Sequence, residues 1–132
     1  MLLMVSFDLF SIKEGSPIYM QILRFVKRGI ISGSISDGDE LPSRRVLSSL
    51  IGINPNTVQK AYRMLEEEGL IQSHSGTKSC MVISSSTMKR IREELMKTDI
   101  LSVISDLKQG GISKAEALGL IEKYWDRKVG AE

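Results

Sequence analysis

The strongest constraint on this fold is a pair of helix start and stop signals that follow each other almost without a gap. Ser43 provides an N-cap for one helix, and Gly52 suits the left-handed residue that ends it. One residue later, Asn54–Pro55 opens a second helix, which Gly69 closes. Two helices this close must cross sharply. The pattern indicates a helix-turn-helix, with an ordinary helical hairpin as the alternative.

Regular patterns also flank this pair of helices. Apolar residues spaced by three and four predict a helix over 17–31, with Ser16 as N-cap and Pro17 at its first position. Residues 32–39 are rich in turn formers and predict a loop. Short strand patterns at 70–73 and 80–83 bracket a polar turn at 74–78. Together they predict a two-stranded β-hairpin, the wing of a winged helix-turn-helix.

The serine-rich run after Ile83 is the best candidate for a boundary, because fresh helical periodicity follows it. An apolar stripe continues to Gly110, and Ser113 with Glu116 forms a capping box for a last helix. We therefore expect a mainly α fold, with a winged helix-turn-helix domain at 1–84 (three helices and the two-stranded wing) and a two-helix tail at 85–132.

Composition limits the class of protein. The apolar share of 42% and the charged share of 26% are typical of folded domains rather than disordered chains. The apolar start, Met1 to Phe10, is interrupted by Ser6 and Asp8 and lacks a basic n-region, so it predicts neither a secretion signal nor a membrane span. The single cysteine, Cys80, permits no intrachain disulfide, and we expect a cytoplasmic protein.

Charge points to one segment more than to the whole chain. The net charge of +2 is too small to indicate nucleic-acid binding. Between Pro42 and Arg63, however, four basic residues occur with no acidic one. In the helix that opens at Asn54–Pro55, the apolar residues share one side. The other side is polar or basic, and its amide, hydroxyl and cationic side chains can bind base edges and phosphates. This outward set comprises Asn56, Thr57, Gln59, Lys60 and Arg63.

Arg44 and Arg45 fall in the first turn of a helix, where the dipole disfavours positive charge. Their position predicts an external anion, and a phosphate would also meet Ser43 and free backbone N–H groups. The alternative is a surface ion pair with the acidic loop at 37–40, which would contribute little to stability.

Enzyme chemistry is poorly supported, and we expect no cofactor. One histidine, His74, and one cysteine cannot supply a zinc quartet within the chain. A nucleophilic pair of Cys80 and His74 would need a third orienting group and a pocket, and neither is indicated. Consecutive helical residues point in different directions, so Glu66–Glu68 indicates a solvated helix end rather than a metal site.

Three stretches, at 38–45, 52–62 and 65–71, closely resemble the GntR-type regulators, and Asn-Pro-Asn-Thr-Val-Gln at 54–59 is similar to the YtrA-like subfamily. The resemblance implies a winged helix-turn-helix that binds double-stranded DNA. Carried over by position, it places DNA contacts at Ser43, Arg45, Pro55, Asn56, Thr57, Gln59 and Gly76. Lys60 and Arg63 join them from the outward side of the helix, and Arg44 joins them from its position in the first turn.

The wing departs from the family pattern of Gly-x-Gly-Thr-aromatic. Here Lys78 replaces the second glycine, Ser79 the threonine and Cys80 the aromatic residue. We include Lys78 among the candidate DNA contacts, and whether this wing enters the minor groove stays open.

The tail is similar to the subfamily's dimerisation region, and its two helices are too short to hide their own apolar stripe or to enclose a large effector pocket. The expected dimerisation residues are Ile100, Ile104, Leu107, Leu120, Ile121, Tyr124 and Trp125. We expect a homodimeric regulator, most simply a repressor at a pseudo-palindromic operator. Three alternatives stay open: a monomer with a folded-back tail, a winged helix that binds protein, and a sensor with a small cleft between tail and winged domain whose effector is unknown.

Overall fold

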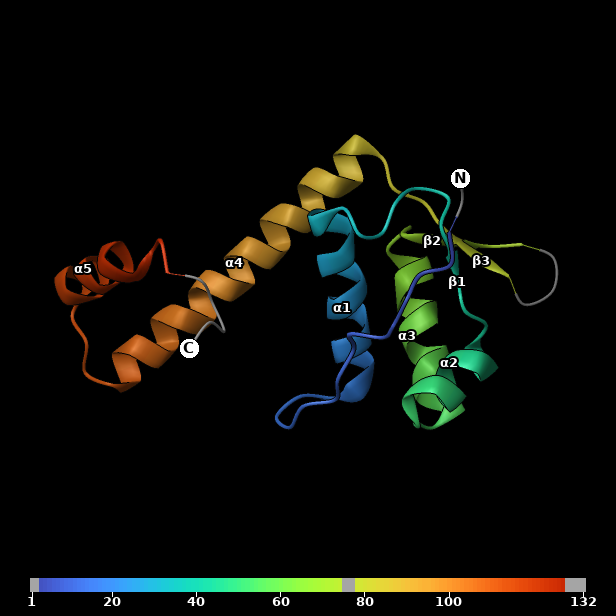
Figure 1. The fold of residues 1–132 in the computed structure, drawn as a ribbon, viewed down its shortest axis with the longest axis horizontal. Helices are drawn as coiled ribbons and strands as arrows, with labels where there is room; N and C mark the ends of the chain where they lie inside the picture. The colour runs from blue at the N-terminus through green and yellow to red at the C-terminus, as the bar shows by residue number, and fades with distance from the viewer. Residues whose placement is uncertain (1–2, 75–77, 128–132) are drawn as a thin grey trace. The chain divides into compact units, whose positions relative to one another are not determined.

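The computed structural model describes residues 3–74 and 78–127 and forms two compact units, Met1–Leu95 and Met96–Glu132 (Figure 1). The units divide inside helix α4 (Ser85–Gln109), further along the chain than the expected boundary at 84/85. The reason is that Ile91 and Leu95, in the first half of α4, are buried in the core of the first unit. The boundary at 84/85 stays a prediction for where the DNA-binding part ends.

The three helices predicted for the winged domain are present in the first unit: α1 (Ile18–Ser32), α2 (Arg44–Ile51) and α3 (Pro55–Glu67). The predicted cap of α1 is wrong, because Pro17 rather than Ser16 is its N-cap residue. The carbonyl oxygen of Ser16 instead accepts a hydrogen bond from the side chain of Gln21, at 2.9 Å. The N-caps predicted for α2 and α3 are both confirmed.

The wing belongs to a sheet with one more strand than predicted. Strands β2 (Ile71–Ser73) and β3 (Ser79–Met81) form the expected antiparallel hairpin, and β1 (Glu40–Leu41) pairs antiparallel with the other edge of β3. The order is β1-β3-β2. The segment near the N-terminus continues this edge, because the backbone N–H of Val5 donates to the carbonyl oxygen of Glu40 at 2.7 Å.

The core of the first unit lies between α1 and α3 and under the sheet. Burial of a large apolar side chain stabilises the folded state by about 1.5–3 kcal/mol relative to leaving it exposed. The largest fully buried side chains here include Ile22, Val26, Ile30, Leu47, Val58, Tyr62 and Leu65. On α2, Leu47 is buried whereas Val46 and Leu50 are exposed. The short α2 therefore meets the core through Leu47 and the half-buried Ile51, and presents Val46 and Leu50 to solvent.

The second unit contains the second half of α4 and helix α5 (Lys114–Tyr124), joined by a turn in which Gly111 has a φ of 75°. The predicted capping box is present in part, since the Ser113 hydroxyl accepts a hydrogen bond from the backbone N–H of Glu116 at 3.2 Å. Between these helices lies an apolar groove of about 380 Å³, lined by residues that include Ile100, Ile104, Leu107 and Ile121.

Candidate nucleic-acid interface

The turn between α2 and α3 is held by hydrogen bonds that its own sequence supplies. Gly52 adopts φ 68°, ψ 40°, and its backbone N–H donates to the carbonyl oxygen of Ser48. The Ser48 hydroxyl donates back to the carbonyl oxygen of Ile53, at 2.6 Å. Asn54 then caps α3 by accepting the backbone N–H of Asn56 at 2.8 Å. The crossing of the two helices is thus a defined turn rather than a flexible link.

Helix α3 has one buried side and one exposed side. Val58, Ala61, Tyr62 and Leu65 are buried, which ties the helix to α1 and α2. The predicted outward residues are exposed except for Thr57, which is half-buried; the exposed ones are Asn56, Gln59, Lys60 and Arg63. Pro55, a contact that the family resemblance implies, is exposed as well. The structure therefore places the predicted amides at the N-terminal end of an open helix surface, where a groove-reading helix carries its base contacts.

Tyr62 links α3 to the start of α2. Its hydroxyl donates to the carbonyl oxygen of Pro42 at 2.6 Å, and the side chain is almost fully buried. Burial raises the pKa of the Tyr62 phenol, while the nearby Arg44 guanidinium opposes this rise. The sequence placed Tyr62 only on the core side of α3. The signal for its second role is that a buried tyrosine needs a partner for its hydroxyl.

Arg44 and Arg45 lie at the start of α2 with Ser43. The Arg44 guanidinium carbon lies 5.2 Å from the centre of the Tyr62 ring, and its Nε is buried without a hydrogen-bond partner among the described residues. Arg45 is exposed. Ser43 already accepts the backbone N–H of Val46 at 3.2 Å.

The acidic loop, which was the alternative partner for these arginines, is engaged elsewhere. Asp37 accepts the backbone N–H of Ile83 at 2.7 Å, and Asp39 accepts that of Ser36 at 2.8 Å. The Glu40 carboxylate lies 3.9 Å from the Lys78 ammonium. Within residues 3–74 and 78–127, no ion pair joins this loop to Arg44 or Arg45.

The predicted basic contacts differ in how available they are. The Lys60 ammonium lies 3.9 Å from the centre of the Tyr19 ring on α1, so its charge is held toward α1 by a cation–π contact. Arg63 is exposed on α3. In the wing, Lys78 is exposed and His74 donates its backbone N–H to the Lys78 carbonyl oxygen at 2.8 Å. Gly76, the predicted wing contact, lies outside the described residues.

The tail residues predicted for dimerisation are open to different degrees. Leu107 and Leu120 are half-buried within the second unit, and the other five are exposed. Trp125 is 78% exposed and Ile100 49%. This is much apolar surface for two helices to leave in water.

Neither a metal group nor a membrane-spanning helix occurs in the part of the chain that the structure describes. No three His, Cys, Asp or Glu side chains there are grouped so that they could hold a metal ion. None of its helices is both long and apolar enough to cross a bilayer.

A helix-turn-helix with an exposed polar recognition helix and a flanking β-hairpin defines a winged-helix DNA-binding protein. The family model of the gntR bacterial regulatory proteins matches residues 18–79. The transcriptional repressor YtrA of Bacillus subtilis is 34% identical over 123 residues, which cover 91% of this chain and 89% of the repressor. The chain belongs to the GntR family and is a DNA-binding transcription regulator.

Solved structures agree with this family. A GntR family transcriptional regulator from Listeria monocytogenes has a TM-score of 0.73 and 28% identity, with 85% of this chain and 98% of that chain covered. YtrA from Sulfolobus acidocaldarius, a GntR-family transcription factor, has a TM-score of 0.52 and 30% identity, with 76% of this chain and 97% of that chain covered. The mainly α winged-helix fold expected from the sequence is thereby confirmed.

Proposed function

We propose that the chain is a homodimeric repressor that binds a pseudo-palindromic operator in the cytoplasm through α3 and the start of α2. The observation that carries the DNA contacts is the exposed polar side of α3, together with the exposed Arg45 at the start of α2. Asn56 and Gln59 are assigned to base edges, and Arg44 and Arg45 to phosphates. The relative YtrA of Bacillus subtilis is named a transcriptional repressor, which favours repression here.

The second copy is proposed to cover the apolar surface of the tail. Ile100, Ile104, Ile121, Tyr124 and Trp125 are 38–78% exposed. Apolar surface is worth about 25 cal/mol for each Å² removed from water, so burying several such residues in both protomers supports a stable dimer. A twofold dimer presents two recognition helices to two half-sites about one helical turn, or a multiple, apart.

Substitution of Ile104 by aspartate tests the dimer. An unpaired carboxylate is costly to bury, so Ile104→Asp is expected to shift the protein from dimer to monomer in light scattering at micromolar concentration. It should also weaken operator binding, because one half-site is lost from each complex. Ser102→Asp, an exposed charge change on the same helix, is the matched control and should stay dimeric. A wild-type protein that scatters as a monomer contradicts this part of the proposal.

A further inference from the structure

Lys60 on the recognition helix α3 is held by an aromatic ring of α1. Its ammonium lies 3.9 Å from the centre of the Tyr19 ring. The ring is half-buried and packs against the core of the first unit, whereas Lys60 is exposed. A lysine side chain has four rotatable carbons and gains no fixed direction from solvent. The packed ring therefore limits where Lys60 can place its charge.

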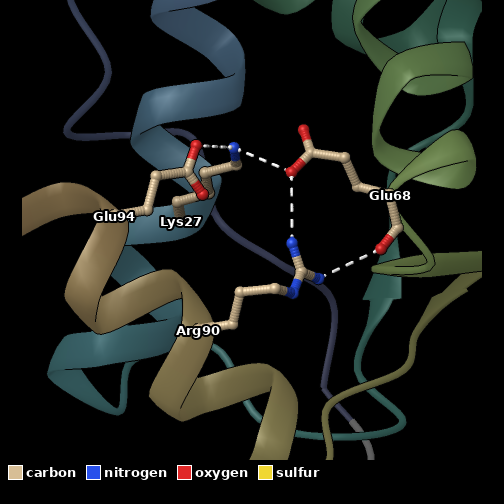
Figure 2. A network of polar contacts seen from close by, with 4 residues as sticks. All are labelled: Lys27, Glu68, Arg90 and Glu94. Carbon is tan, nitrogen blue, oxygen red and sulfur yellow. Dashed lines mark hydrogen bonds and ion pairs between the residues drawn. The ribbon is translucent and has the colours of Figure 1, made fainter.

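The charge of Lys60 is not neutralised within the protein. No carboxylate forms an ion pair with its ammonium among the described residues. Glu68, the acidic C-cap residue of α3, is engaged elsewhere, because its carboxylate lies 3.0 Å from the Lys27 ammonium and 3.7 Å from the Arg90 guanidinium (Figure 2). An ammonium has three N–H donors, which one aromatic face cannot all satisfy. Lys60 thus keeps both charge and donors for an external anion.

The pair of Lys60 and Tyr19 lies on one flank of α3, and the start of α2 lies on the other. Successive residues of an α-helix are about 100° apart, so Lys60 and Tyr62 leave α3 on nearly opposite sides. Tyr62 donates its hydroxyl to Pro42, next to the start of α2, whereas Lys60 contacts α1. Helix α3 accordingly lies between α1 and α2 (Figure 1). The exposed Arg45 at the start of α2 and the ammonium of Lys60 therefore flank α3 on two sides.

A helix in the major groove has a sugar–phosphate backbone on each side of it. The groove is about 12 Å wide, which admits one α-helix. Side chains in the middle of the exposed helix surface reach base edges, whereas side chains at its flanks reach phosphates. Lysine meets a phosphate as a compact point charge and needs no planar fit. Holding Lys60 toward α1 directs its ammonium away from the base edges and toward one backbone.

We propose that Lys60 binds a DNA phosphate on the α1 side of the recognition helix, and that Tyr19 is the positioning residue that holds its ammonium there. This inference rests on the proposed DNA-binding function of α3. It adds a phosphate contact on the flank opposite to that of Arg45, and it assigns a role to a residue outside the helix-turn-helix. Holding a long side chain before binding removes part of its ordering cost, so Tyr19 raises affinity without adding base preference.

The test is a double-mutant cycle measured by fluorescence anisotropy over a salt series on two duplexes. One duplex has a random sequence, and the other carries an operator recovered from genomic fragments bound by the wild-type protein. Tyr19→Leu and Tyr19→Met each remove the aromatic face, Tyr19→Phe keeps it, and Lys60→Met removes the charge. Lys89→Gln, which removes an exposed charge on α4, is the matched control. Thermal melting checks that each variant is folded.

The loss of the Lys60 charge is expected to act on both duplexes alike. Lys60→Met should lower the log–log salt slope by about 0.9 and leave the ratio of operator to random-sequence affinity unchanged. Tyr19→Leu and Tyr19→Met should weaken binding about threefold on both duplexes, the ordering cost of one long side chain. Tyr19→Phe and Lys89→Gln should bind as the wild type does. In the Lys60→Met background, loss of the aromatic face should have no further effect.

Three results overturn the inference and leave the DNA-binding function intact. A loss for folded Tyr19→Leu that persists in the Lys60→Met background shows a general structural effect and overturns the positioning role. Tighter binding by Tyr19→Leu shows that the ring withholds Lys60 from DNA. A loss for Lys60→Met that is confined to the operator assigns Lys60 to a base rather than to a phosphate. A wild-type protein that binds neither duplex overturns the proposed function, and this inference with it.

Discussion

At the scale of single residues, the interface depends on which polar groups are already engaged inside the protein. Tyr62 donates its hydroxyl to Pro42, and Lys60 is held over the Tyr19 ring. Gln59 and Arg45 are exposed and have no such contact among the described residues. This difference between side chains already engaged within the protein and exposed ones explains why residues of similar chemistry should contribute unequally to DNA binding.

Replacement of Tyr62 by phenylalanine should destabilise the first unit by about 1–2 kcal/mol, because the carbonyl group of Pro42 loses its hydrogen-bond donor. Urea unfolding at pH 7 measures the change in free energy of unfolding. Tyr19→Phe is the matched control, since Tyr19 is only half-buried, and it should change stability by less than about 0.5 kcal/mol. Equal losses in the two variants would contradict the role given to the Tyr62 hydroxyl.

The same residue predicts a pH dependence. The pKa of Tyr62 in the folded protein is raised above its ordinary value of 10.0, so the unfolded state releases the proton first. The contribution of Tyr62 is therefore complete below pH 10 and falls as pH rises above it. The difference in unfolding free energy between wild type and Tyr62→Phe should shrink as pH rises from about 10 to about 12. A constant difference across that range would contradict burial as the cause.

Base and phosphate contacts should differ in their salt dependence. Gln59→Ala is expected to weaken operator binding by about 1–3 kcal/mol and to relax preference at one base pair. Arg45→Gln should weaken binding to all duplexes and reduce the log–log salt slope by about 0.9, because one phosphate contact is lost. Fluorescence anisotropy over a salt series measures both, with Gln109→Ala in the tail as control. If Gln59→Ala reduced the salt slope and Arg45→Gln did not, the assignment of Gln59 to a base and of Arg45 to a phosphate would be contradicted.

At the scale of elements, caps and glycines predicted the helices well, whereas contacts between distant segments were not predictable. The helix-turn-helix was evident because Ser43, Asn54 and Gly52 act on their own neighbours. Strand β1 is only Glu40–Leu41, too short to show alternation, and it exists because β3 lies beside it. The ion pairs that Lys27 makes with Glu68 and Glu94 were not predictable either. These residues are far apart in the sequence, and charged residues in helices usually face water.

Gly52 should be the most sensitive position of the turn. Its φ of 68° is left-handed, and a side chain there is strained by roughly 1–2 kcal/mol. No atom of the described residues, apart from its chain neighbours, lies within 4 Å of where an added Cβ would sit, so the cost is conformational rather than steric. Gly52→Ala is therefore expected to lower the midpoint of urea unfolding without changing the slope. Gly119→Ala, a helical glycine of α5 with open space around it, should be neutral or stabilising.

At the scale of the whole molecule, family and fold follow from the first unit, and the functional assembly depends on the tail. The tail's role was predicted from its resemblance to the subfamily's dimerisation region and from an apolar stripe that its two helices are too short to hide. The structure divides the apolar residues of α4 between two places: Ile91 and Leu95 face the core of the first unit, and Ile100, Ile104 and Leu107 line the groove beside α5.

The central claim is sequence-specific binding of DNA by a dimer through α3. The most direct measurement is capture and sequencing of genomic fragments bound by the purified protein, followed by titration of the recovered site over a range of salt. The account predicts a pseudo-palindromic site with half-sites about one helical turn or a multiple apart, two protomers per site, and affinity that falls steeply as salt rises. Capture of fragments without a shared motif, or binding that is indifferent to salt, would contradict it.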